Sequence, residues 1–99
     1  MATSIEDTSA QYTIDYFIEK FDKIPAKNWI RGRFGFNGIH CALGHCGMTY
    51  TGGDNNESKA LMGLIPDVAF INDDAIQYGT TPKERILNKL YEIKDSNIN

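Results

Sequence analysis

The strongest constraint on the fold is a helix start close to the end of the chain. Thr81-Pro82-Lys83-Glu84 combines a capping box with proline at the first helical position. Apolar side chains follow at the spacing of one helix face, at Ile86, Leu87, Leu90, Tyr91 and Ile93. The pattern predicts a helix over residues 82–94, and the rest of the chain must cover its apolar face.

Other segments suggest what covers that face. Aromatic and aliphatic residues recur at helical spacing over residues 11–24, which end at Pro25, and over residues 57–65, which end at Pro66. The apolar run 68–71 fits either a short helix or a buried strand. Residues 29–41 alternate around the turn signal Asn37-Gly38 and predict a short β-hairpin. The predicted class is therefore mainly α (small α+β), with three to four packed helices and one short β-hairpin.

The length and composition predict a single domain. The chain has 99 residues, 41% of them hydrophobic, which suffices for one core and not for two. We expect residues 10–94 to form one compact domain. The polar segments 1–9 and 95–99 are expected to be a flexible N-terminus and a flexible tail.

Charge and hydropathy exclude several classes of partner. The chain has thirteen acidic and ten basic residues, its net charge is −3, and no stretch is dense in Lys or Arg. This argues against charge-driven binding to nucleic acid or membranes. No apolar run reaches the roughly 20 residues that span a bilayer, and no signal peptide is recognisable. We expect a cytoplasmic protein with reduced thiols (in the host cytoplasm or virion if it is viral).

One short stretch gathers all the residues that suggest chemistry. His40, Cys41, His45 and Cys46 are the only histidines and cysteines, and they fall within seven consecutive positions. A tetrahedral zinc site needs four convergent ligands, usually as two pairs well separated in sequence. On a helix these four would not all converge, although two of them completed by Asp54 or Asp73 would suffice. We predict no metal and no cofactor, with a metal site as an alternative.

The same stretch raises the possibility of a cysteine nucleophile. Cys41 at a helix N-terminus would have a lowered pKa, His45 one turn later could be its base, and Asn72 or Asp73 could orient that base. However, buried cysteine commonly acts as a small hydrophobe, and the adjoining Gly and Ala residues favour close packing. We therefore interpret the stretch first as part of the core and lean against an enzyme.

A second candidate site carries positive charge. Arg31 and Arg33 would share one face of the predicted strand and, with the Gly52-Gly53 loop, could bind a small anionic ligand such as a nucleotide. A solvated strand face is the simpler interpretation of the two arginines. The loop lacks a preceding strand and the lysine spacing of a phosphate loop.

The motifs resemble those of a protein family. Cys41-Ala42-Leu43-Gly44, then Asn72-Asp73, then Thr81-Pro82-Lys83-Glu84-Arg85 resemble small uncharacterised bacterial and phage proteins with Cys-Ala-Leu-Gly, Asn-Asp and Thr-x-x-Glu-Arg motifs. The resemblance covers residues 12–94 and implies a compact helical fold and a phage or bacterial origin, without a defined reaction. We expect a non-enzymatic accessory or interaction protein, either a virion component or a modulator of a host protein. Its partner is expected to be a protein, and an oligomer is possible.

Overall fold

The computed structural model describes residues 11–32, 35–36, 38–49, 52–53 and 55–98. The expected class is confirmed, because helices dominate and one short strand pair is present. The elements are α1 (Ile14–Asp22), η3 (Ala26–Asn28), β1 (Gly35–Phe36), β2 (Ile39–His40), α2 (Ala42–His45), α3 (Asn56–Leu64), α4 (Val68–Asp74), η4 (Ile76–Tyr78) and α5 (Pro82–Ile98). Residues 1–9, expected to be a flexible N-terminus, lie outside the described part of the chain.

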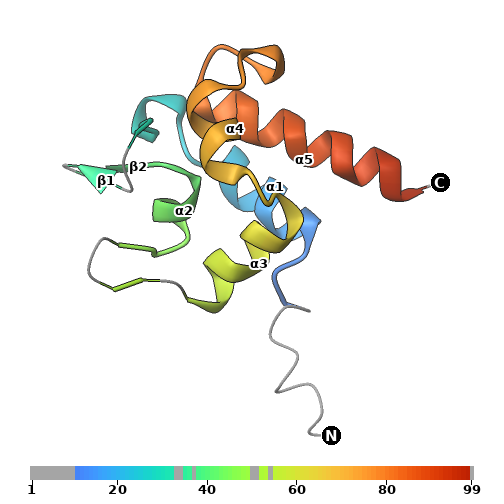
Figure 1. Cartoon of the computed structure of the whole chain (residues 1–99), viewed down its shortest axis with the longest axis horizontal. Coiled ribbons are helices and arrows are strands. Elements are labelled where there is room, and N and C mark those ends of the chain that lie inside the picture. The colour runs from blue at the N-terminus through green and yellow to red at the C-terminus, as the bar shows by residue number, and fades with distance from the viewer. Residues whose placement is uncertain (1–10, 33–34, 37, 50–51, 54, 99) are drawn as a thin grey trace, which may run out of the picture.

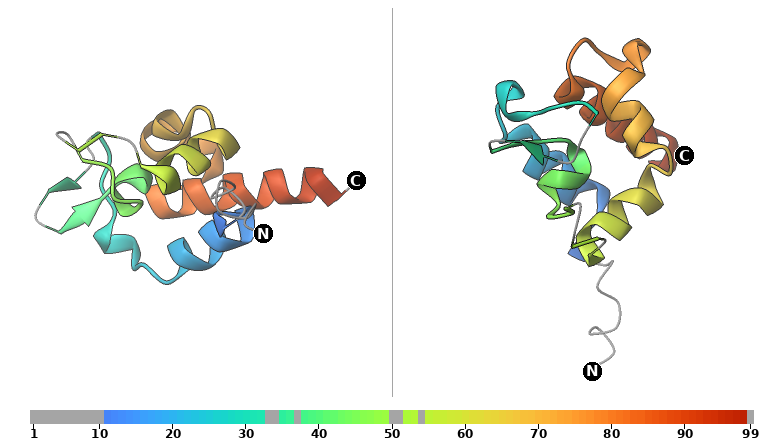
Figure 2. Two further views of the ribbon diagram at one scale, coloured as in Figure 1. Left: turned by 90° about the horizontal axis from the view of Figure 1, so that it is seen from below. Right: turned by 60° about the vertical axis from the view of Figure 1, so that its left-hand side comes forward.

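The long helix α5 organises the fold. It runs along the molecule between α1 on one side and α4 on the other (Figures 1 and 2). Its start is capped as predicted, since Thr81 Oγ1 accepts from Glu84 N at 3.1 Å. Glu84 Oε1 accepts from Thr80 N at 2.9 Å, one residue before the position that a standard capping box uses. The segment 95–98, expected to begin a tail, continues the helix instead.

The core is continuous from α1 to α5. Phe17 and Phe21 stack with ring centroids 5.7 Å apart, and Phe21 meets Trp29 edge-on at 5.1 Å. From α5, Ile86 and Leu90 are fully buried against the same core. Tyr91, which the sequence pattern placed on the apolar face, is 44% exposed. Tyr91 lies at the edge of the apolar face of α5, about 140° around the helix from Ile86 at 100° per residue.

The predicted hairpin is present and short. Gly35 pairs with His40 and Phe36 with Ile39, in antiparallel register. Trp29 forms a further bridge with His40, and Ile30 N donates to His40 O at 3.0 Å. A side chain at position 35 would place its Cβ 2.3 Å from His40 Nδ1, so any larger residue there would force the His40 ring to move. Asn37 of the predicted turn lies outside the described residues.

Two helices follow the loop after α2. In α3, Asn55 Oδ1 accepts from Ser58 N at 2.8 Å and Ser58 Oγ accepts from Asn55 N at 2.9 Å, a reciprocal cap. The run 68–71, left open between helix and strand, forms a helix that extends to Asp74. Within the described ranges, no helix has the length and apolar character needed to cross a membrane.

Candidate functional site

Both cysteines flank the short helix α2 and are buried. Cys41 is its N-cap, with Sγ accepting from Gly44 N at 3.5 Å, and Cys46 is its C-cap. Their side chains are free thiols, and the two residues are 9% and 3% exposed. The predicted position of Cys41 at a helix N-terminus is therefore confirmed, although its sulfur is used to cap the helix.

Burial sets the protonation state of both thiols. It raises the pKa of Cys41 above its usual value of 9.0, and the nearby charge of Asp73 adds to this effect. Burial followed by the charge of Glu57 raises the pKa of Cys46 to about 12. A nucleophilic cysteine needs a lowered pKa, so both thiols are in the opposite state.

The ring of His45 packs against two other rings. Its ring centroid is 4.7 Å from that of Trp29 and 5.2 Å from that of His40. Burial, with the charge of His40 as a second cause, lowers its pKa to about 4, so the imidazole is neutral at pH 7. Its Nε2 is buried and has no hydrogen-bond partner among the described residues. A base of this kind would be weak. The hydrogen bond that joins the two residues is a backbone bond, from His45 N to Cys41 O at 2.9 Å.

The remaining candidates for this centre lie elsewhere. Asp73 Oδ1 accepts from Asn72 Nδ2 at 2.7 Å, so it has a partner other than His45. Among the described residues, no group of three or more His, Cys, Asp and Glu side chains is placed to hold a metal ion. Asp54, a possible completing ligand, lies outside the described residues. The four soft ligands therefore surround α2 without forming a described metal centre.

The candidate anion site is only partly described. Arg31 Nε donates to Asp73 O at 2.9 Å, and Arg31 Nη2 bonds Asp74 Oδ1 at 2.5 Å. Arg31 thus interacts with the C-terminal end of α4, where helix carbonyls lack intrahelical partners. Arg33 lies outside the described residues. In the glycine loop, Gly52 N donates to Thr49 Oγ1 at 2.7 Å, which leaves this amide engaged within the loop.

A buried hydrogen-bond network surrounds Asn72. Asn72 is 1% exposed. Its Oδ1 accepts from Ala42 N at 3.1 Å, and its Nδ2 donates to Ile30 O at 3.0 Å. Its backbone oxygen accepts from Arg85 Nε at 3.0 Å and from Arg85 Nη2 at 2.9 Å. Asn72 therefore connects the chain before the hairpin, the first turn of α2, and α5.

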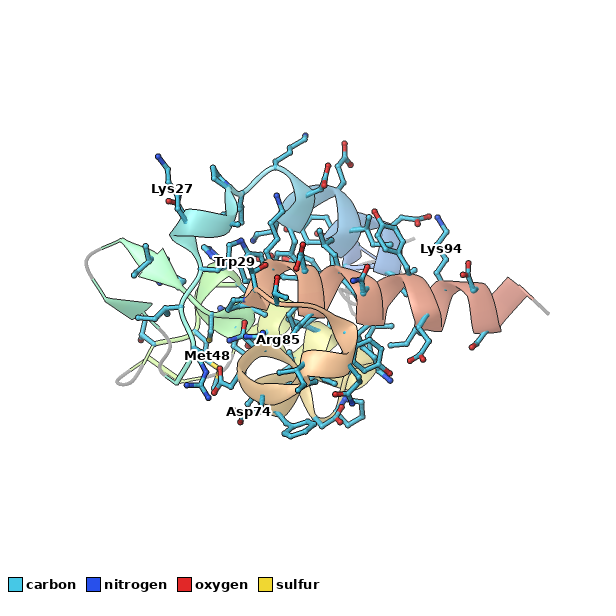
Figure 3. All side chains as sticks on the ribbon, turned by 90° about the horizontal axis from the view of Figure 1, so that it is seen from above. Lys27, Trp29, Met48, Asp74, Arg85 and Lys94 are labelled. Carbon is cyan, nitrogen blue, oxygen red and sulfur yellow. The ribbon has the colours of Figure 1, made fainter. Side chains whose placement is uncertain are left out.

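Arg85 entered the sequence analysis only as the last residue of a motif, and its buried position was not predicted. It is 5% exposed, and its Nη1 donates to Gly79 O at 3.3 Å. Figure 3 shows it in the interior where α4 passes over α5. By helical periodicity Arg85 lies about 140° from Leu90, so the pattern would place it in solvent. It is buried because the end of α4 covers that side of α5, which no local pattern indicates.

A second polar cluster joins α1 to α3. Glu57 Oε2 accepts from Tyr16 Oη at 2.9 Å and forms a salt bridge with Lys20. Burial, with the Glu57 hydrogen bond as the next cause, raises the pKa of Tyr16 to about 12. Because the same carboxylate contributes to the raised pKa of Cys46, the cluster also reaches the end of α2. Its charges are compensated internally, as in a structural ion pair.

Comparison with known proteins identifies no matching family model, no matching curated protein and no matching solved structure. The resemblance to the small bacterial and phage proteins therefore stays a prediction. The structure does place residues from all three motifs in contact, since Ala42, Asn72 and Arg85 share the network described above. In this chain the motif residues hold the helices together, and they form no described catalytic arrangement.

Proposed function

We propose that this protein is a small non-enzymatic interaction protein whose partner is another protein. The observation that carries the proposal is the exposure of three large apolar side chains on adjoining elements. Phe70 of α4 is 51% exposed, Ile76 of η4 is 79% exposed and Tyr91 of α5 is 44% exposed. Since exposed apolar area gains free energy when it is covered, these side chains favour association with another protein.

The state of the chemical groups supports the same proposal. The thiols of Cys41 and Cys46 are buried with raised pKa values, and the pKa of His45 is lowered to about 4. These groups are therefore held in their neutral forms at pH 7 and packed in the core. Such a cluster stabilises the fold, and the geometry favours it over a nucleophile with an adjacent base.

The motif resemblance and the net charge suggest the biological setting. We propose an accessory protein of phage or bacterial origin that acts in the cytoplasm or the virion, as a virion component or a modulator of a host protein. The net charge of −3 favours a protein partner over nucleic acid, because phosphate backbones would be repelled.

Affinity capture with the full chain and with a variant that lacks the Cys41 thiol tests this proposal. The full chain and a Cys41→Ser variant would serve as baits in a bacterial lysate, with a size-matched acidic protein as the control bait. We expect both baits to retain the same protein, and the purified pair to re-form a stoichiometric complex. Retention of nothing beyond the control, or loss of the partner on Cys41→Ser while the helical circular dichroism persists, would contradict the proposal. Rapid iodoacetamide labelling of native Cys41 would favour thiol chemistry instead.

A further inference from the structure

Four aromatic side chains form a continuous row through the core. Tyr16 meets Phe17 edge-on with ring centroids 5.1 Å apart, and Phe17 stacks on Phe21 at 5.7 Å. Phe21 in turn meets the indole of Trp29 at 5.1 Å. All three separations are those of rings in direct contact. We call these four side chains the aromatic row. Its two ends are a phenol and an indole, which lose an electron far more readily than the phenylalanines between them.

The phenol end of the row has a proton acceptor in place. Tyr16 Oη donates to Glu57 Oε2 at 2.9 Å, and the same carboxylate forms a salt bridge with Lys20. A phenol that loses an electron becomes a strong acid, so its proton moves readily to a base that already lies at hydrogen-bond distance. Glu57 is such a base, and its position is fixed by two partners before any oxidation takes place.

The indole end has no comparable acceptor for its proton. Trp29 is buried, and its Nε1 donates to a backbone carbonyl, Ile24 O, at 3.4 Å. A carbonyl is too weak a base to take the indole proton, so an oxidised Trp29 keeps a positive charge in the apolar core, where charge is costly. Transfer of an electron from Tyr16 removes that charge. The positive charge that is left belongs to Lys20, which is partly exposed to water.

We propose that Tyr16 is a redox-active tyrosine, at which a one-electron oxidation of this protein comes to rest. The co-reactant is a one-electron oxidant, which removes an electron from Trp29 and keeps it. An electron then passes along the aromatic row from Tyr16 to Trp29, while the phenol proton moves to Glu57 Oε2. The products are an intact indole, a neutral phenoxyl radical and a protonated Glu57. This activity goes beyond the interaction function and needs no partner protein.

A second trio of the same chemical groups provides a matched control. Tyr78 Oη donates to Glu92 Oε1 at 2.7 Å, and Lys89 Nζ bonds the same oxygen at 2.9 Å. Tyr78 thus has the same carboxylate acceptor and ammonium neighbour as Tyr16. No ring contact joins it to the aromatic row within the described residues, and Glu92 is exposed. The two tyrosines therefore separate the effect of the row from the effect of the carboxylate.

Flash photolysis of the full chain tests the proposal. A pulse that the indole alone absorbs ionises Trp29, the only tryptophan, and hexaamminecobalt(III) captures the ejected electron. The absorbance of the indole radical should decay as that of a phenoxyl radical grows, and more slowly in D2O because a proton moves with the electron. Tyr16→Phe should remove most of the phenoxyl signal. Glu57→Gln should slow its growth on the order of a hundredfold. Tyr78→Phe should leave both rate and yield unchanged.

Three results would overturn the inference. The first is an indole radical that decays equally fast in wild type and in Tyr16→Phe. The second is an equal loss of the phenoxyl signal in Tyr12→Phe, since Tyr12 also lies near Phe17, at 6.4 Å between ring centroids. The third is an unchanged rate in a folded Glu57→Gln variant. Circular dichroism and thermal denaturation check the fold of each variant. Tyr16→Phe removes one hydroxyl group and keeps the ring, so it decides the question even if Glu57→Gln does not fold.

Discussion

Replacing Asn72 by alanine should destabilise the fold strongly, because the side chain serves two backbone groups at once. Its Oδ1 accepts from Ala42 N at 3.1 Å, and its Nδ2 donates to Ile30 O at 3.0 Å. The bonds from Arg85 go to the backbone oxygen of Asn72, so the substitution leaves their acceptor in place. Asn72→Ala therefore isolates the contribution of the amide side chain.

The magnitude follows from what the substitution leaves unpaired. Ala42 is fully buried, so its N–H loses its partner without access to water, at about 1–3 kcal/mol. Ile30 is partly exposed, so its carbonyl costs less, and the helix propensity of alanine returns about 0.5 kcal/mol. We expect a net loss of about 2–4 kcal/mol in the free energy of unfolding. For a domain of this size that corresponds to a Tm lower by roughly 10–25 °C.

Asn88→Ala provides the matched control. Asn88 lies on α5 and donates through Nδ2 to Tyr78 O at 2.6 Å, but it is exposed, so water can replace the lost bond. The gain in helix propensity offsets much of the loss, and we expect a change within about 0.5 kcal/mol. Urea denaturation of both variants, followed by circular dichroism at 222 nm and by the fluorescence of Trp29, measures the two free energies.

The comparison can fail in two ways. If Asn72→Ala lies within about 1 kcal/mol of wild type, the network is not a stabilising connection between its three segments. If Asn88→Ala costs as much as Asn72→Ala, the loss reflects removal of an amide in general and not its burial. A change in the denaturant slope for Asn72→Ala alone would indicate that the hairpin and α2 separate from the rest of the fold.

Further predictions concern the side chains around α2. The pKa of His45 is lowered from 6.5 to about 4, so its contribution to stability is complete above pH 6.5 and is lost as the pH falls toward 4. We expect the free energy of unfolding to fall by about 2 kcal/mol over this range, after allowance for the partial exposure of His45. His45→Phe should remove this part of the pH dependence of urea denaturation, and parallel curves for both proteins would contradict it. The pKa of Cys46 is raised to about 12, so at pH 8 its thiol should react with iodoacetamide on the order of a thousandfold more slowly in the native state than in urea. Equal labelling rates in the two states, measured by peptide mapping, would refute this. Cys41→Ser should keep the cap of α2, whereas Cys41→Ala should lower the free energy of unfolding by about 1 kcal/mol relative to it; equal Tm values would argue against a capping role.

Local signals predicted the elements well because their causes are local. The cap of α5 joins Thr81 and Glu84, which are three residues apart. The turn of the hairpin contains Gly38, whose φ of +86° is a conformation that glycine adopts readily. The end of α5 was less predictable, since polar residues after 94 continue a helix as readily as they leave one. The choice of helix for 68–71 could not be made from a four-residue apolar run.

The candidate site was harder to predict because its decisive contacts are long-range. Cys41 was correctly placed at a helix N-terminus, but its raised pKa depends on burial by segments distant in sequence. Asn72 was considered as an orienter of a base, and its contacts with Ala42 and Ile30 span 30 and 42 residues. No spacing rule within one helix contains that information.

Arg85 and Arg31 explain how α4 can exist as a short helix. A helix of seven residues leaves its last carbonyls without intrahelical partners. Arg85 donates twice to Asn72 O from below, and Arg31 donates to Asp73 O from the solvent side. Positive charge at this end also suits the helix dipole. The inner side of α4 lies in the core and its C-terminal carbonyls are engaged by side chains from two other segments, so the position of this helix depends on long-range contacts at both places.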